Sequence, residues 1–167
     1  MRFRIEQRFD ATPEDVLAIY IDPAFYPELE GLPKVSAPEV LSHERTGDRV
    51  RMRIRYRFTA DLPLAASAVI DPDKLTWVDD TIYDLRSQIA TTELLPDHYA
   101  DRLVASARSP FEAISNDPPR ARRRVEGDLQ VRMPFVGGQV ERAIISGLRE
   151  HLADEERVAA GWIRSHE

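Results

Sequence analysis

Residues 138–166 read GQVERAIISGLREHLADEERVAAGWIRSH and form the longest periodic stretch of the chain. The stretch contains no proline, and its apolar and charged residues separate onto opposite sides when drawn at about 100° per residue. The apolar side holds Val140, Ile144, Gly147, Leu148, Leu152, Val158, Ala159 and Trp162, and the charged side holds Arg142, Arg149, Glu150, Asp154, Arg157 and Arg164. This pattern predicts one long helix with one solvated and one covered face.

Two ionisable residues, His151 and Glu155, lie within the apolar side of this helix, one turn apart. Side chains at this spacing are neighbours, so the pair can share a hydrogen bond, act as acid and base, or orient the polar end of a ligand. The structural alternative, which we favour from the sequence, is that Glu155 reaches solvent at the rim and His151 bonds a strand residue or a backbone carbonyl. An interior Glu155 requires a partner or a proton, because an unpaired buried carboxylate is costly.

Before this helix, apolar and polar residues alternate in several runs typical of strands. The first run, with Phe3, Ile5 and Phe9, precedes two short helical segments, one starting at Thr12-Pro13 and one over residues 24–29. Six more strand-like runs follow, divided by turn-forming residues. They span residues 35–45, 49–59, 75–84, 87–95, 101–114 and 120–133.

The order of these segments predicts how they pack. Consecutive strands with short connections favour antiparallel pairing, because parallel neighbours need crossover segments that this sequence lacks. The apolar face of such a twisted sheet must be covered, and the C-terminal helix is the element large enough to cover it. We expect an α+β fold: a seven-stranded curved antiparallel sheet, two short helices after the first strand, and the long C-terminal helix packed on the concave face. A straight helix on a curved sheet leaves a space for side chains or a ligand, with residues 62–70 as a loop or single helical turn over it.

This arrangement resembles the helix-grip fold of the START-like, Bet v 1-like (SRPBCC) superfamily over nearly the whole chain. Within it, the segment Asp22-Pro23-Ala24-Phe25-Tyr26-Pro27 resembles the one that follows the first helix in that superfamily. Residues 125–128 (VEGD) and 134–138 (PFVGG), with Glu141 and Trp162, are similar to a bacterial branch with no established function. The resemblance implies one START-like domain over residues 1–167. It also implies a carrier of an apolar ligand or, less often, a cyclase-like enzyme.

The candidate ligand-binding residues are those expected to border the space between sheet and helix. They are Tyr56, Phe58, Trp77, Asp79 and Tyr83 from the strands, and Ile144, Leu148, His151, Leu152 and Glu155 from the helix. These residues offer apolar walls with few polar anchors, the usual makeup of a small-molecule site, and a plain filled core is the alternative. A strand register shifted by one residue would replace Trp77 and Asp79 by Val78 and Asp80.

Composition argues against several classes of function. The chain of 167 residues has 43 % hydrophobic residues, no cysteine and a formal net charge of −6. The negative charge argues against nucleic-acid binding, and no stretch approaches the roughly 20 apolar residues of a transmembrane helix. Four scattered histidines without a metal-binding spacing predict neither a metal site nor a cofactor. Met1 leads directly into a strand pattern rather than a signal peptide, so we expect a cytoplasmic protein.

Arginines occupy alternate positions from Arg49 to Arg57 and again at Arg120, Arg122 and Arg124. A basic stripe on the convex face would allow peripheral contact with an anionic membrane. The simpler interpretation, which we favour, is a solvated face with cross-strand ion pairs to acids such as Glu6, Glu126 and Asp128.

The leading hypothesis is therefore non-catalytic binding or transport of a hydrophobic small molecule or lipid between sheet and helix. One alternative is a polyketide cyclase- or dehydratase-like enzyme that uses His151 and Glu155, or Asp79 with a tyrosine. The other is a protein-interaction adaptor with a filled core.

Overall fold

Seven strands form one antiparallel sheet in the order β1-β7-β6-β5-β4-β3-β2, so the first two strands of the chain lie at its opposite edges. The computed structural model describes residues 1–167 apart from the side chain at position 37. The strands are β1 (Arg2–Phe9), β2 (Val35–Thr46), β3 (Arg49–Phe58), β4 (Thr76–Asp84), β5 (Ile89–Pro96), β6 (Leu103–Asn116) and β7 (Pro119–Val131). The predicted seven-stranded antiparallel sheet is confirmed.

Short helices occupy the two longest connections before β4. They are α1 (Pro13–Tyr20), the 3-10 helix η1 (Pro23–Leu29), α2 (Leu64–Ser67) and the 3-10 helix η2 (Pro72–Lys74). Thr12 caps α1, because its hydroxyl accepts a hydrogen bond from the backbone N–H of Asp15 at 3.2 Å, and Pro13 occupies the first helical position. For residues 62–70 the sequence left a loop or a single helical turn open, and α2 is the helical turn. No helix in the described part of the chain is both long enough and apolar enough to cross a membrane.

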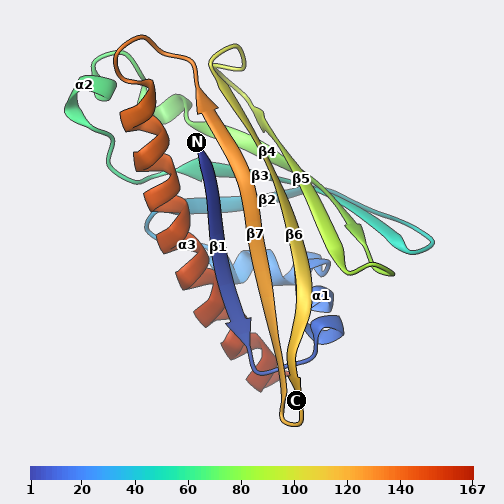
Figure 1. Ribbon diagram of the computed structural model, residues 1–167. Coiled ribbons are helices and arrows are strands. Elements are labelled where there is room, and N and C mark those ends of the chain that lie inside the picture. Colours follow the sequence, from blue (N-terminus) through green and yellow to red (C-terminus); the bar gives the residue numbers. More distant parts are fainter.

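The long helix α3 (Gly137–Ser165) lies alongside β1 and β7 (Figure 1). Its backbone also comes close to β2 at the opposite edge of the sheet. Gly147 permits the approach to β3, because a Cβ atom there would lie 2.7 Å from the ring of Phe58. The helix therefore bridges the two sides of a curled sheet and leaves the inner faces of the middle strands less covered. This is the helix-grip arrangement expected from the sequence.

Strand β3 shows how alternation sorts side chains between the two faces of the sheet. Val50, Met52 and Ile54 are buried on the inner face. On the outer face, Arg51 forms two hydrogen bonds with Asp80 of β4, at 2.9 and 2.7 Å. The predicted period of two is confirmed over the whole strand.

The outer arginines are paired rather than arranged as a free basic stripe. Arg55 bonds Asp97 twice at 3.1 Å, and Arg57 pairs with Asp73 at 2.5 Å. On β7, Arg122 and Arg124 both bond Glu112. The favoured interpretation of cross-strand ion pairs is therefore supported, although most of the partners differ from the acids named from the sequence. The stripe carries no argument for membrane contact.

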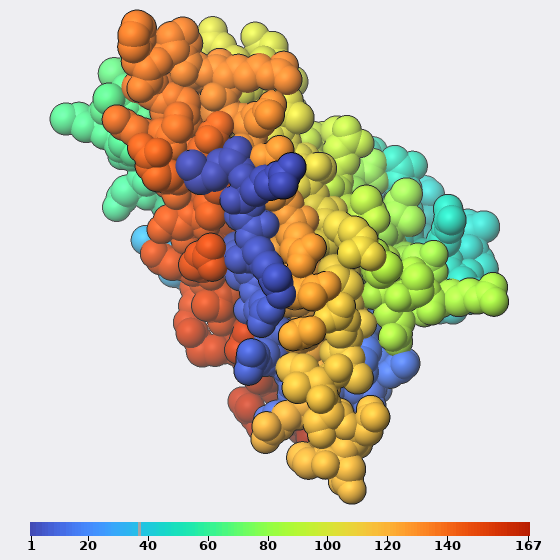
Figure 2. Space-filling model, viewed as in Figure 1, coloured from blue at the N-terminus to red at the C-terminus, as the bar shows by residue number. Residues whose placement is uncertain are grey.

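Strand β1 fills the seam between α3 and β7 on the face seen in Figure 2. Gly127 of β7 makes room there for Phe3, since a Cβ atom at position 127 would lie 2.5 Å from the Phe3 ring. Phe3 thus packs across the sheet and closes this side of the interior.

Candidate functional site

A cavity of about 150 Å³ lies between the sheet and α3. Most of its lining side chains are apolar and come from β3 to β7 and from α3. Two of the lining residues, Lys74 and His98, are exposed, which places the entrance between η2 and the β5–β6 loop. Tyr20, Arg123 and Glu155 also line the cavity, and Tyr20 belongs to α1. Figure 1 shows α1 at the end of the molecule opposite to α2. The cavity therefore has an open end and a closed, polar end.

All ten residues predicted from the sequence line this cavity. They are Tyr56, Phe58, Trp77, Asp79, Tyr83, Ile144, Leu148, His151, Leu152 and Glu155. Asp80 bonds Arg51 on the outer face, so the strand register predicted for Trp77 and Asp79 is correct and the shifted one is wrong. That these residues bind a ligand stays a prediction.

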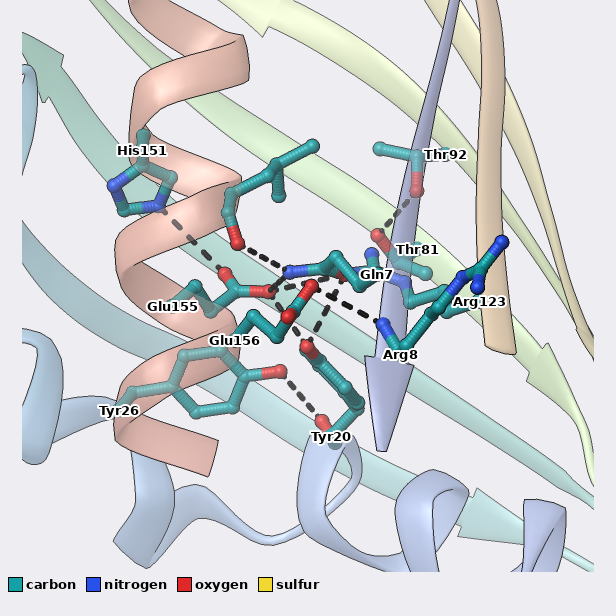
Figure 3. A network of polar contacts seen from close by, with 11 residues as sticks. Gln7, Arg8, Tyr20, Tyr26, Thr81, Thr92, Arg123, His151, Glu155 and Glu156 are labelled. Atoms are coloured by element: carbon teal, nitrogen blue, oxygen red, sulfur yellow. Dashed lines mark hydrogen bonds and ion pairs between the residues drawn. The ribbon is translucent and has the colours of Figure 1, made fainter. Parts of the chain in front are cut away.

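Glu155 lies at the centre of a buried polar network at the closed end (Figure 3). Its Oε1 accepts hydrogen bonds from the Tyr20 hydroxyl at 2.7 Å, Gln7 Nε2 at 3.1 Å and Arg123 Nη1 at 3.1 Å. The donors come from α1, β1 and β7, so the network ties three elements to α3. The residue is 4 % exposed, and the interpretation that placed Glu155 at the rim is wrong.

The network fixes the charges of its members. Burial alone would raise the pKa of Glu155, but His151, Arg123 and Tyr20 outweigh it and lower that pKa to about 2. Burial acts to lower the pKa of Arg123, yet Tyr20 and Glu155, with Tyr83 and Tyr26, raise the pKa of the guanidinium above its ordinary value. The guanidinium further lies 4.3 Å from the centre of the Tyr20 ring. At neutral pH the pair is therefore ionised, and Glu155 is too weak a base for proton transfer.

His151 is less well satisfied than its neighbour on α3. Its ring is 3 % exposed, and Nε2 lies 3.6 Å from Glu155 Oε2, beyond ordinary hydrogen-bond length. Across the described residues, Nδ1 has no hydrogen-bond partner. The expected bond to a strand residue or backbone carbonyl is therefore not formed. Instead, the ring meets Tyr56 edge to face, with ring centres 6.2 Å apart.

Asp79 lies on the cavity wall with little to balance its charge. Its Oδ1 accepts a hydrogen bond from Trp77 Nε1 at 2.9 Å. No other side chain that the structure describes donates to this carboxyl or pairs with it. Burial raises the pKa of Asp79 to about 7, although Trp77, Arg123 and His151 pull it down. Asp79 is thus a carboxyl group inside the cavity that changes its charge near neutral pH.

Three members of the closed end, Gln7, Tyr20 and Arg123, were not predicted as site residues. The strand pattern held a signal for two of them: Gln7 shares its face with Ile5 and Phe9, and Arg123 falls out of phase with the outward arginines of β7. Among the residues described, no group of three or more His, Asp or Glu side chains is placed to hold a metal ion.

Comparison with known proteins adds a family and a fold. A family model described as "Protein of unknown function (DUF2505)" matches residues 4–163. No curated protein sequence matches the chain.

Several solved structures share the fold at low sequence identity. A START superfamily protein from Mycobacterium smegmatis is 15 % identical, with 99 % of each chain covered and a TM-score of 0.59. The Zhui aromatase/cyclase from Streptomyces sp. R1128 is 15 % identical, with 94 % of each chain covered and a TM-score of 0.60. Norcoclaurine synthase from Thalictrum flavum is 15 % identical, covering 93 % of this chain and 83 % of its own, with a TM-score of 0.63. The predicted START-like, Bet v 1-like fold is confirmed.

Proposed function

We propose that this chain, which belongs to the DUF2505 family of proteins of unknown function, binds a hydrophobic small molecule without transforming it. The observation that supports the proposal is the cavity between the sheet and α3, with its mainly apolar lining. Small-molecule sites combine such walls with a few polar groups that orient the ligand. Here those groups are Asp79 and His151, which retain unused hydrogen-bonding atoms.

The volume limits the size of the ligand. Apolar cavities of about 150 Å³ hold guests the size of benzene, whereas drug-sized ligands occupy roughly 300–1,000 Å³. We therefore propose a compact molecule of one or two rings. A lipid with two acyl chains would require α3 and the sheet to move apart. The adaptor hypothesis loses support, because it required a filled interior.

Two neighbouring positions on β6 provide a direct test. Ala105 lines the cavity, whereas Val104 points outward and is 44 % exposed. Ala105→Phe should fill the cavity, and Val104→Phe adds the same ring outside it. We expect indole and toluene to shift amide NMR signals of cavity residues in wild-type protein and in V104F but not in A105F. Absence of binding to wild-type protein, or equal binding to A105F, would refute the proposal.

One observation favours a second candidate, a cyclase- or dehydratase-like enzyme. Asp79, whose pKa lies near 7, lies close to Tyr56 in the cavity and has the protonation behaviour of a general acid or base. An aromatase/cyclase is among the proteins of similar fold. Incubation with a short polyketide thioester mimic, followed by mass spectrometry, should then show a cyclised or dehydrated product that Asp79→Asn does not form. Equal product with D79N, or none with either protein, removes this candidate.

A further inference from the structure

Asp79 places one carboxyl group in the wall of a mainly apolar cavity. We propose that the cavity selects ligands that carry a protonated amine, with the ammonium group bound by the Asp79 carboxylate and the apolar body held between the sheet and α3. This inference rests on the proposed ligand-binding function and specifies the chemical class of the ligand.

The carboxylate has an acceptor atom to spare. Trp77 donates to Oδ1 at 2.9 Å, and Oδ2 receives no hydrogen bond from the described residues. The nearest hydroxyl on the same face of β4, that of Thr81, is already bonded to Thr92 of β5 at 2.9 Å. Asp79 is partly buried, and a carboxylate with reduced access to water gains more from a donor supplied by a ligand than a surface carboxylate does.

Uncharged aromatic side chains lie next to Asp79. The rings of Tyr56 and Trp77 stack with their centres 6.0 Å apart and their planes inclined by 26°. Burial raises the pKa of Tyr56 well above its ordinary value, so its hydroxyl stays neutral. The aromatic pair therefore surrounds the carboxylate with uncharged side chains and adds no second charge beside it.

None of the other ionisable groups that the structure describes in the cavity forms an ion pair with Asp79. Arg123 of β7 is neutralised by Glu155 of α3, 3.1 Å away. His151 directs Nε2 toward Glu155 rather than forming an ion pair with Asp79. Lys74 lies at the entrance and is exposed, so water and salt screen its charge. A bound organic cation restores neutrality to the interior, whereas a bound anion adds to the excess of negative charge.

The proposal implies a pH dependence with a defined sign. The pKa of Asp79 is raised to about 7 by burial, with Arg123, His151, Glu155 and Trp77 as the groups that act on it. An ammonium ligand stabilises the ionised carboxylate. Its affinity should therefore increase as the pH rises through 7 and fall below that value, where Asp79 is protonated in the free protein.

The test uses three probes with the same phenyl ring: phenethylamine, its neutral isostere propylbenzene, and the anion hydrocinnamate. Binding is followed by NMR at about pH 8 and again at about pH 6, which bracket the titration of the carboxyl. Wild-type protein should bind phenethylamine about tenfold or more tightly than propylbenzene at the higher pH, as expected for hydrogen bonds to a charged group. This preference should shrink at the lower pH, and hydrocinnamate should bind weakest.

Two matched variants locate the effect. Asp79→Asn keeps the shape and removes the charge, so phenethylamine and propylbenzene should bind with similar affinity. Asp80→Asn alters the adjacent aspartate on the outer face and should leave the preference intact. If propylbenzene and phenethylamine bind wild-type protein equally well, the inference fails while the proposed function stands. If none of the probes binds, both fail. The comparison of the two pH values on wild-type protein needs no variant to fold.

Discussion

Replacing Arg123 by methionine removes the cation from the buried network at the closed end of the cavity. The side chains of Arg123 and Glu155 are 12 % and 5 % exposed, so R123M leaves an almost fully buried carboxylate without its charged partner. Breaking a buried ion pair from one side typically costs roughly 3–5 kcal/mol. We therefore expect R123M to lose about 3 kcal/mol of stability near neutral pH.

The pH dependence of this loss separates the ion pair from simple packing. In wild-type protein the folded-state pKa of Glu155 is depressed, so its contribution is complete above 4.5 and is lost as the pH falls toward 2. In R123M the positive charge that opposed the effect of burial is gone, so the folded-state pKa of Glu155 rises. If that pKa exceeds the unfolded value, the variant should lose stability as the pH rises, because folding then retains a proton that the unfolded chain releases. The double variant R123M/E155Q should lack this dependence.

Urea unfolding followed by circular dichroism, at about pH 5, 6 and 7, measures both effects. Arg122→Met is the matched control: Arg122 precedes Arg123 on β7, is 36 % exposed and bonds Glu112 on the outer face. Its loss should cost under about 1 kcal/mol, as for other exposed pairs. The reasoning is refuted if R123M costs no more than R122M, or if its stability follows the same pH curve as R123M/E155Q.

Two further predictions concern packing and the same network. Gly147→Ala should destabilise the protein by about 1–3 kcal/mol, because its Cβ would press against the Phe58 ring at 2.7 Å. Gly161→Ala in the same helix should be neutral or stabilising by up to about 1 kcal/mol, since only the flexible end of the Arg164 side chain lies near the added Cβ. Equal melting temperatures of the two variants would contradict this prediction. Tyr20→Phe should cost about 1–3 kcal/mol because it removes the 2.7 Å hydrogen bond to Glu155. The Tyr56 hydroxyl makes no hydrogen bond to the described residues, so Tyr56→Phe should lower the free energy of unfolding less in the same urea assay. An equal loss in the two variants would argue against the network.

The sequence predicted the fold because its signals are local. Alternation along β3 and the apolar stripe of α3 identify the elements from a few residues each, and the turns between strands imply antiparallel neighbours. The cavity-lining residues follow from the same two periodicities, since inward positions on β3, β4 and α3 have to meet. The alternation of inward and outward residues along β1 and β7 also indicates that Gln7 and Arg123 point inward.

The partners of those inward polar residues were beyond the reach of local patterns. Gln7 lies 148 positions from Glu155, and Arg123 lies 32 positions from it. The pairing of inward donors and acceptors depends on the position and rotation of α3 relative to the sheet. Close contacts such as that of Gly147 with Phe58 set this position. A periodic pattern gives the face of a residue and leaves open its position across the interior. For this reason the sequence argument placed Glu155 at the rim, where a lone carboxylate would be tolerated.

Two carboxyl groups share this interior, and their partners give them different properties. Glu155 accepts three hydrogen bonds on one oxygen, lies beside a cation and has a pKa near 2, so it is a fixed part of the scaffold. Asp79 accepts one hydrogen bond, has no cation within ion-pair distance among the described residues and has a pKa near 7. Desolvation acts on both, and the difference lies in how many donors the fold supplies. The folded chain thus satisfies the buried Glu155 and leaves the partly buried Asp79 with an open acceptor in the cavity wall. An acid left in that condition is stabilised when a ligand brings the missing donor, and this is why we assign binding to Asp79 and structure to Glu155.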